Sequence, residues 1–153
     1  MVQNMHVFYV FLKGEAMQPS QSKINTDKPK TELFEFQNWE VYRKCLLLTK
    51  ETFEIAKELS RYQDAKLSDL LKRASTSVVL NLAQGVSCYS LRDKSNFWRI
   101  AKGSLFECVA ILDVVEVVSD AEFKTSKDLK EDMQSIGRML SGLLRWAEKQ
   151  NKG

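Results

Sequence analysis

The spacing of the apolar residues constrains this chain more than any other feature, because they recur every three or four positions in four long runs. This spacing places apolar side chains on one face of an α-helix. The first run consists of Trp39, Tyr42, Leu46, Thr49, Phe53 and Ala56, and it is widened by Cys45, Leu48, Ile55 and Leu59. It predicts a helix over about 37–61 with one face turned toward a core.

Three further runs repeat this pattern. The second contains Leu67, Leu70, Leu71, Ala74, Val78, Asn81 and Leu82. The third contains Phe97, Ala101, Ser104, Cys108, Ile111, Val115 and Val118. The fourth contains Leu129, Met133, Ile136, Leu140, Leu143 and Ala147. Four amphipathic segments joined by short turns predict an all-α fold, an antiparallel up-down-up-down four-helix bundle.

Short signals indicate where these helices begin and end. Gly85 closes the second run and is typical of a helix C-terminus. Ser90 and Asp93 have the S-x-x-D spacing of a helix start, in which the serine caps the first turn. Ser119 and Glu122 repeat this kind of spacing, so they predict a short connection or the first turn of the fourth helix.

The third helix carries apolar residues around nearly its whole circumference. Those outside its main stripe are Trp98, Ile100, Phe106, Val109, Leu112, Val114 and Val117. A helix of this kind is usually buried on two sides. We therefore expect contacts between subunits along it.

The first 33 residues differ in composition from the rest of the chain. Residues 7–12 form an apolar run too short to span a bilayer, and residues 14–32 have the polar composition of a linker. We expect 1–33 to be a disordered or extended N-terminal arm and 34–150 to be the bundle domain. Met17 heads the polar stretch, so a start codon assigned too early is one interpretation, and an arm that contacts other subunits is the alternative.

The scarcity of histidine removes most catalytic sites from consideration. His6 is the only histidine among 153 residues, which rules out Ser-His-Asp triads, Cys-His pairs and His-rich metal sites. The three separated cysteines, Cys45, Cys88 and Cys108, are typical of a reducing, cytoplasmic setting. We expect no enzymatic activity, no cofactor, no metal, no small-molecule substrate and no membrane insertion.

The formal net charge of +3 is uninformative, but the charge is unevenly distributed. Residues 61–102 hold eight basic and three acidic side chains, a net +5, whereas 103–118 hold three acidic and no basic ones. A basic segment can follow nucleic-acid phosphates, and an ordinary solvated surface is the alternative. Tyr89 would stack on a base or pack within its loop. The candidate nucleic-acid contacts are Lys72, Arg73, Arg92, Lys94, Arg99 and Lys102.

A motif with fixed spacing crosses the second and third helices. It comprises Ser77, Asn81, Gly85, Phe97, Ala101, Gly103, Ser104 and Glu107. With these residues the chain resembles the 23S rRNA intervening-sequence protein family of four-helix bundle proteins, and the resemblance extends more loosely over 36–147. The chain departs from the family pattern at Lys72, at Val78 and Val79, at Gln84 and at Trp98.

The resemblance implies more than a fold. Members of the family are described as homopentamers. The family also includes the accessory variability determinant of diversity-generating retroelements, which binds a reverse transcriptase and nucleic acid. The resemblance therefore implies self-assembly, RNA or DNA as a partner and a reverse transcriptase as a further one.

The motif residues also have structural interpretations. Asn81 lies on an apolar face, where its amide needs partners, so it is a clamp to the neighbouring helix or turn, or else a ligand contact. The two motif serines bond back to their own helices or mark a close helix approach. Gly103 predicts a tight crossing, because glycine inside a helix costs about 1 kcal/mol relative to alanine. Glu107 would bond to Asn81 or pair with Arg73.

These observations predict a non-enzymatic, homo-oligomeric bundle that binds RNA or DNA through a basic surface and serves as an accessory to a nucleic-acid enzyme such as a reverse transcriptase. The alternative is a structural or protein-binding bundle whose basic segment only solubilises it.

Overall fold

The computed structural model describes residues 34–61, 65–118 and 125–151. A short 3-10 helix, η1 (Glu35–Asn38), comes first. Four long helices follow, namely α2 (Glu40–Arg61), α3 (Ala65–Ser87), α4 (Leu91–Val118) and α5 (Lys127–Gln150). Every regular element in these three ranges is helical, so the predicted all-α class is confirmed.

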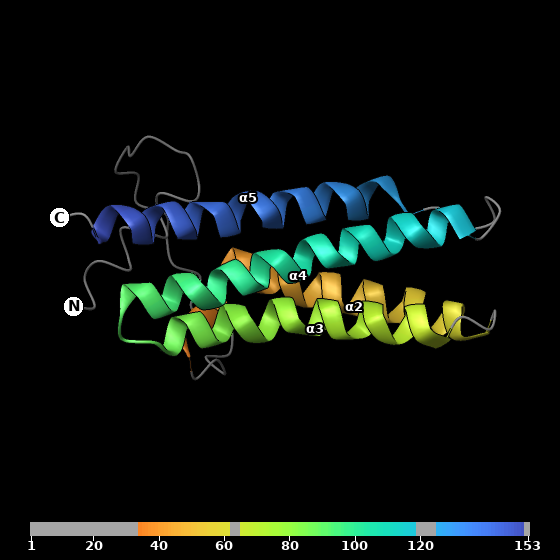
Figure 1. Ribbon diagram of the computed structural model, residues 1–153, viewed down its shortest axis with the longest axis horizontal. Helices are drawn as coiled ribbons and strands as arrows, with labels where there is room; N and C mark the ends of the chain where they lie inside the picture. Colours follow the sequence, from red (N-terminus) through yellow and green to blue (C-terminus); the bar gives the residue numbers. More distant parts are fainter. Residues whose placement is uncertain (1–33, 62–64, 119–124, 152–153) are drawn as a thin grey trace, which may run out of the picture.

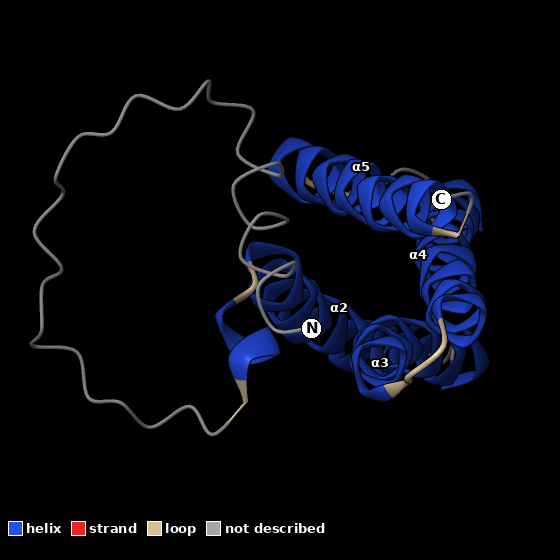
Figure 2. Ribbon diagram, turned by 90° about the vertical axis from the view of Figure 1, so that its left-hand side faces the viewer, coloured by secondary structure: helices blue, strands red, loops and turns tan. Residues whose placement is uncertain are grey.

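The four long helices lie along the long axis of the molecule, and each runs opposite to the one before it (Figure 1). Seen from the end, they follow one another around the bundle in chain order (Figure 2). Contacts between α2 and α5 close the arrangement, and an ion pair of 2.6 Å between Lys44 and Asp132 links these two helices. The antiparallel up-down-up-down bundle is therefore confirmed.

A single core cluster runs through all four helices, and α5 contributes its predicted stripe to it in full. On α2 the predicted face is right for Cys45, Leu48, Ala56 and Leu59, which are buried, and wrong for two other members. Leu46 and Phe53 are 46% and 36% exposed. The buried side chains of α2 are Val41, Cys45, Leu48, Thr52, Ala56 and Leu59. Two adjacent faces of α2 carry apolar residues at helical spacing, and contact with α3 and α5 selects the one that includes the polar Thr52.

The helix boundaries follow the sequence signals in part. The first predicted helix is divided, because Trp39 is extended (φ −67°, ψ 133°) between η1 and α2. Ser90 caps α4 as expected, since its hydroxyl accepts from the Asp93 amide at 3.0 Å. The predicted end at Gly85 is wrong, because α3 continues to Ser87. The Ser119–Glu122 signal lies outside the described residues, and Ser126 caps α5.

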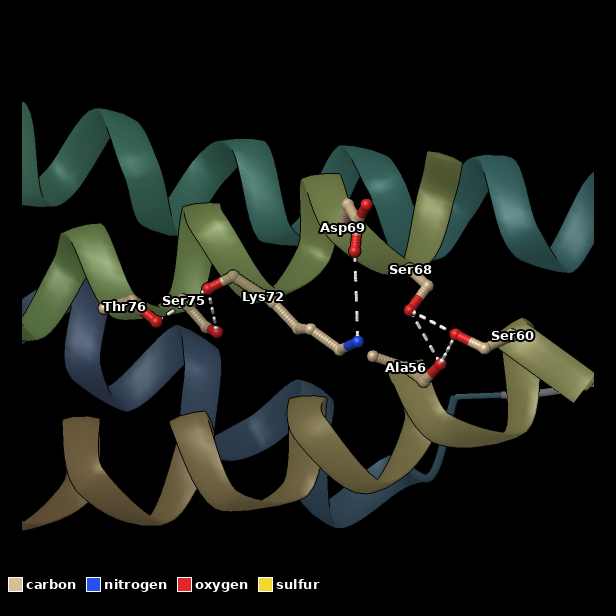
Figure 3. Close-up of polar contacts among 7 residues, drawn as sticks. All are labelled: Ala56, Ser60, Ser68, Asp69, Lys72, Ser75 and Thr76. Carbon is tan, nitrogen blue, oxygen red and sulfur yellow. Dashed lines mark hydrogen bonds and ion pairs between the residues drawn. The ribbon is translucent and has the colours of Figure 1, made fainter. Parts of the chain in front are cut away.

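A group of serine hydroxyls joins the ends of α2 and α3 (Figure 3). The hydroxyls of Ser60 and Ser68 lie 2.8 Å apart, and they reach the Ala56 carbonyl oxygen at 3.0 and 2.8 Å. Ser68 is fully buried. These hydrogen bonds satisfy its hydroxyl and compensate for the cost of removing it from water.

Glu116 joins α4 to the beginning of α5. Its Oε1 accepts a hydrogen bond from the Thr125 amide and an ion pair from Lys130, both at 2.9 Å. These contacts, led by the Lys130 ammonium and followed by Thr125, lower the pKa of Glu116 from 4.5 to about 2. The contact is a charged clamp between the two helices.

The remaining expectations on organisation concern the termini, cysteines and membranes. The expected N-terminal arm, 1–33, and the proposed start at Met17 lie outside the described residues. Cys45 and Cys108 are buried free thiols, and burial raises the pKa of each to about 12. None of the described helices combines the length and apolarity needed to cross a bilayer.

Candidate nucleic-acid interface

The candidate basic residues do not form one patch. Lys72 and Arg73 lie on α3, at one end of a groove of about 430 Å³. Arg99 and Lys102 lie on the side of α4 that faces α5. The groove, here called the α3 groove, is lined by Lys72, Arg73, Thr76, Ser77, Leu80, Asn81 and Gln84.

Within the α3 groove the charged groups differ in availability. The Lys72 ammonium lies 3.9 Å from the Asp69 carboxylate on its own helix (Figure 3). Arg73 is exposed, and its guanidinium has no ion-pair partner among the described residues. The Gln84 side-chain amide is exposed and unpartnered in the same part of the chain. Arg73 and Gln84 are therefore free to bind a ligand.

The basic residues of α4 divide into three environments. Arg92 is exposed near the beginning of the helix and has no ion-pair partner in the described ranges. Arg99 lies 3.7 Å from Glu148 of α5. Lys102 lies above the ring of Phe106, 5.8 Å from its centroid. Of these three, Arg92 keeps the largest capacity for a phosphate.

Lys94 has a structural role that its charge alone does not indicate. Its ammonium donates to the carbonyl oxygens of Val86 at 2.9 Å and Gly85 at 3.4 Å. These carbonyls belong to the last turn of α3, where a cation is favourable. Burial lowers the pKa of Lys94. Lys94 therefore ties the beginning of α4 to the end of α3.

Three motif residues form one hydrogen-bonded cluster between α3 and α4. The hydroxyls of Ser77 and Ser104 lie 2.7 Å apart. The Asn81 Nδ2 donates to the carbonyl and hydroxyl oxygens of Ser77 at 2.9 and 3.0 Å. Both Asn81 bonds stay within α3, so the expected clamp from Asn81 to a neighbouring helix or turn is wrong, and the Ser77–Ser104 pair makes the contact between the helices. Asn81 lines the α3 groove, and its Oδ1 accepts no hydrogen bond from the described residues.

Gly85 leaves room for the indole of Trp98. A Cβ at Gly85 would lie 2.3 Å from Trp98 Nε1 and 2.5 Å from its Cδ1. The indole packs directly against the α3 backbone, and its Nε1 donates to the Leu82 carbonyl at 3.3 Å. Gly85 is therefore a packing residue inside α3, and not the helix stop that the sequence suggested.

Other motif positions differ from expectation. A Cβ at Gly103 would meet nothing within 4 Å, so the predicted tight crossing is wrong within this chain. Glu107 is exposed, and neither of its expected bonds, to Asn81 or to Arg73, is among the described contacts. Phe97 is half-buried on the predicted stripe of α4. Tyr89 is fully exposed, at 103%, so the prediction that it packs in the loop is wrong.

The structure shows which apolar residues of α4 are exposed, whereas the sequence indicated only that apolar residues surround this helix. Along α4, exposed residues at steps of three and four form a second row opposite the buried one. This row, the outer face of α4, consists of Ile100, Gly103, Glu107, Ala110, Val114 and Val117. Beside it, Phe106 and Val109 begin an apolar groove of about 560 Å³ between α4 and α5. Large apolar side chains that lie exposed close together, such as Ile100, Phe106, Val109, Val114 and Val117, are typical of an interaction surface.

The fold and these surfaces define a small helical bundle. No group of His, Cys, Asp or Glu side chains suited to a metal ion occurs in the described ranges. A family model described as 23S rRNA-intervening sequence protein matches residues 37–142. The chain belongs to this family. No curated protein and no solved structure matches it significantly.

Proposed function

We propose that this chain is a non-enzymatic, self-associating four-helix bundle that binds RNA or DNA through basic side chains of α3 and the first half of α4. The observation that carries the proposal is the availability of Arg73 and Arg92. Both are exposed and lack ion-pair partners among the described residues, in a segment of net charge +5. Tyr89, exposed in the loop before Arg92, adds a surface on which a base can stack.

The outer face of α4 is where copies of the chain meet in this proposal. Val114 and Val117 are 46% and 79% exposed, and their burial against another copy would remove apolar area from water. We propose a pentamer only because the motif resembles that of a family whose members are described as homopentamers. We propose a cytoplasmic setting only because the three cysteines are separated in the sequence.

The accessory role belongs to the same proposal. A bundle that gathers several basic segments can hold a nucleic acid for an enzyme such as a reverse transcriptase. The gene neighbourhood tests this part. A nearby reverse transcriptase with a variable-repeat target supports the retroelement role, whereas a position inside a ribosomal RNA gene supports the intervening-sequence role and contradicts the adaptor.

A second candidate function is a bundle that binds only proteins. The exposed apolar surface of α4 favours it, because such a surface needs no nucleic acid to be useful. Binding to nucleic acid separates the two candidates.

The direct test reverses charge at the free arginines in the full chain. Arg73→Glu combined with Arg92→Glu should weaken binding to single-stranded RNA roughly tenfold or more, because two phosphate contacts become repulsive. The assembly size, measured by light scattering, should not change. Lys50→Glu on exposed α2 is the matched control and should bind as the parent does. Equal binding by the double variant and the parent would contradict the proposed surface.

A further inference from the structure

The α3 groove changes in chemistry along its length. Lys72 and Arg73 supply positive charge at one end, and Asn81 and Gln84 supply amides at the other. Leu80 lies between them, 56% exposed. Arg73 and Leu80 are seven residues apart, so they are separated by about 10 Å along the helix axis at about 1.5 Å per residue. The groove thus presents a cation, an apolar side chain and hydrogen-bonding amides in order.

This order matches the parts of a nucleotide. A phosphate is bound by arginine or lysine. A nucleobase has an apolar face and an edge that asparagine and glutamine recognise by paired hydrogen bonds. The Gln84 amide is unpartnered in the described chain, and the Asn81 amide is held in place by Ser77. The Gln84 amide is therefore able to form paired bonds, whereas Asn81, whose Nδ2 already donates twice to Ser77, offers its Oδ1 as a single acceptor.

The apolar contact decides which form of nucleic acid can use these groups. All residues that line the α3 groove belong to α3, so the groove lies along one helix, with α2 and α4 packed beside that helix. In a duplex the faces of the bases are covered by stacking on their neighbours, so Leu80 cannot contact one. The bases of a single strand can unstack and turn a face toward a protein side chain. An unpaired base can therefore enter the groove, whereas a paired base cannot.

We propose that the α3 groove binds a nucleotide of single-stranded RNA or DNA, with Arg73 on the phosphate, Leu80 against the face of the base and Gln84 and Asn81 on its edge. This inference rests on the nucleic-acid binding proposed above, and it adds that the binding prefers unpaired strands. Duplexes contact only the basic side chains, through their phosphates.

The test measures binding of the full chain to short single-stranded RNA oligonucleotides and to a duplex of the same length, at fixed salt. Gln84→Ala and Leu80→Ala should each weaken single-strand binding roughly tenfold, the size of a lost base contact, and leave duplex binding unchanged. Gln134→Ala on exposed α5 is the matched control and should change neither. Both groove side chains are exposed, so the variants should fold as the parent does, which circular dichroism checks.

The outcomes are distinguishable. If the parent protein binds neither probe, the proposed function itself is wrong. If the parent binds but both groove variants bind single strands as tightly as it does, only the groove inference is overturned. Equal losses on single strands and duplex would also overturn it, because a base contact cannot act on a paired strand.

Discussion

Trp98 on α4 limits which residue can occupy position 85 on α3. Its indole occupies the space that any side chain at Gly85 would need, and it also contacts Trp146, with ring centroids 6.3 Å apart. A Cβ at position 85 would lie 2.3 Å from Trp98 Nε1, so this packing requires glycine there unless the indole moves.

Gly85→Ala should lower the free energy of unfolding by about 1–3 kcal/mol, because the added methyl group overpacks the contact with Trp98. The cost should largely disappear in a Trp98→Leu background, where alanine also favours the helix. Urea denaturation of the four proteins in this double-mutant cycle measures the coupling. An equal cost in both backgrounds would show that Gly85 has another role.

Gly103→Ala is the opposite case, because the added methyl group meets nothing within 4 Å. At a concentration where the chain is monomeric, the free energy of unfolding should rise by about 1 kcal/mol, the difference in helix propensity. Light scattering on the same variant reports whether the outer face of α4 tolerates the methyl group in the assembly. A destabilised monomer would contradict the open surroundings of Gly103.

At the level of the helices, the carboxylate of Glu116 holds the end of α4 to the beginning of α5. The pKa of Glu116 is lowered to about 2, below its ordinary value of 4.5, so the charged form is favoured in the folded state. The stabilisation is complete above pH 4.5 and is lost as the pH falls toward 2. The free energy of unfolding, measured by urea denaturation, should therefore fall less between pH 4.5 and pH 2 in Glu116→Gln than in the parent. Equal acid sensitivity in parent and variant would contradict the clamp.

The helices were predictable to different degrees. The stripe of α5 was correct because apolar residues occupy only one of its faces. The stripe of α2 was correct only in part, because Leu46 and Phe53, which are exposed, share the helical spacing of the buried row. Periodicity gives the existence of a helix, whereas the choice between two apolar faces depends on the neighbouring helices. The structural role of Lys94 could not be predicted for a related reason, because the carbonyl groups that it binds belong to the end of another helix, α3.

At the level of the whole molecule, the two exposed valines of the outer face of α4, Val114 and Val117, are expected to drive association. Val114→Glu combined with Val117→Glu should shift the particle to the mass of a monomer at micromolar concentration, because charged groups would have to be buried between copies. Leu47→Glu makes the same chemical change on α2 and should leave the assembly intact. Light scattering measures both. A parent protein that is already monomeric would contradict self-association.

The charge distribution makes Arg73 and Arg92 candidate contacts, and their role stays a prediction. Gln84 and Leu80 enter the proposed site only through the face of α3 that they share with Arg73. The sequence indicated one basic segment, whereas the fold divides it into the α3 groove, the exposed Arg92, the structural Lys94 and two side chains that face α5. This division depends on how the helices pack, so periodicity and charge alone could not predict it.

The measurement that tests the central claim most directly is a salt titration of the full chain with single-stranded RNA and with duplex DNA. Contacts to phosphates release counterions, so the affinity for both should fall steadily as the salt rises. The single strand should remain the tighter ligand at every salt concentration. No detectable binding at about 50 mM salt, or an affinity that does not change with salt, would contradict nucleic-acid binding by this bundle.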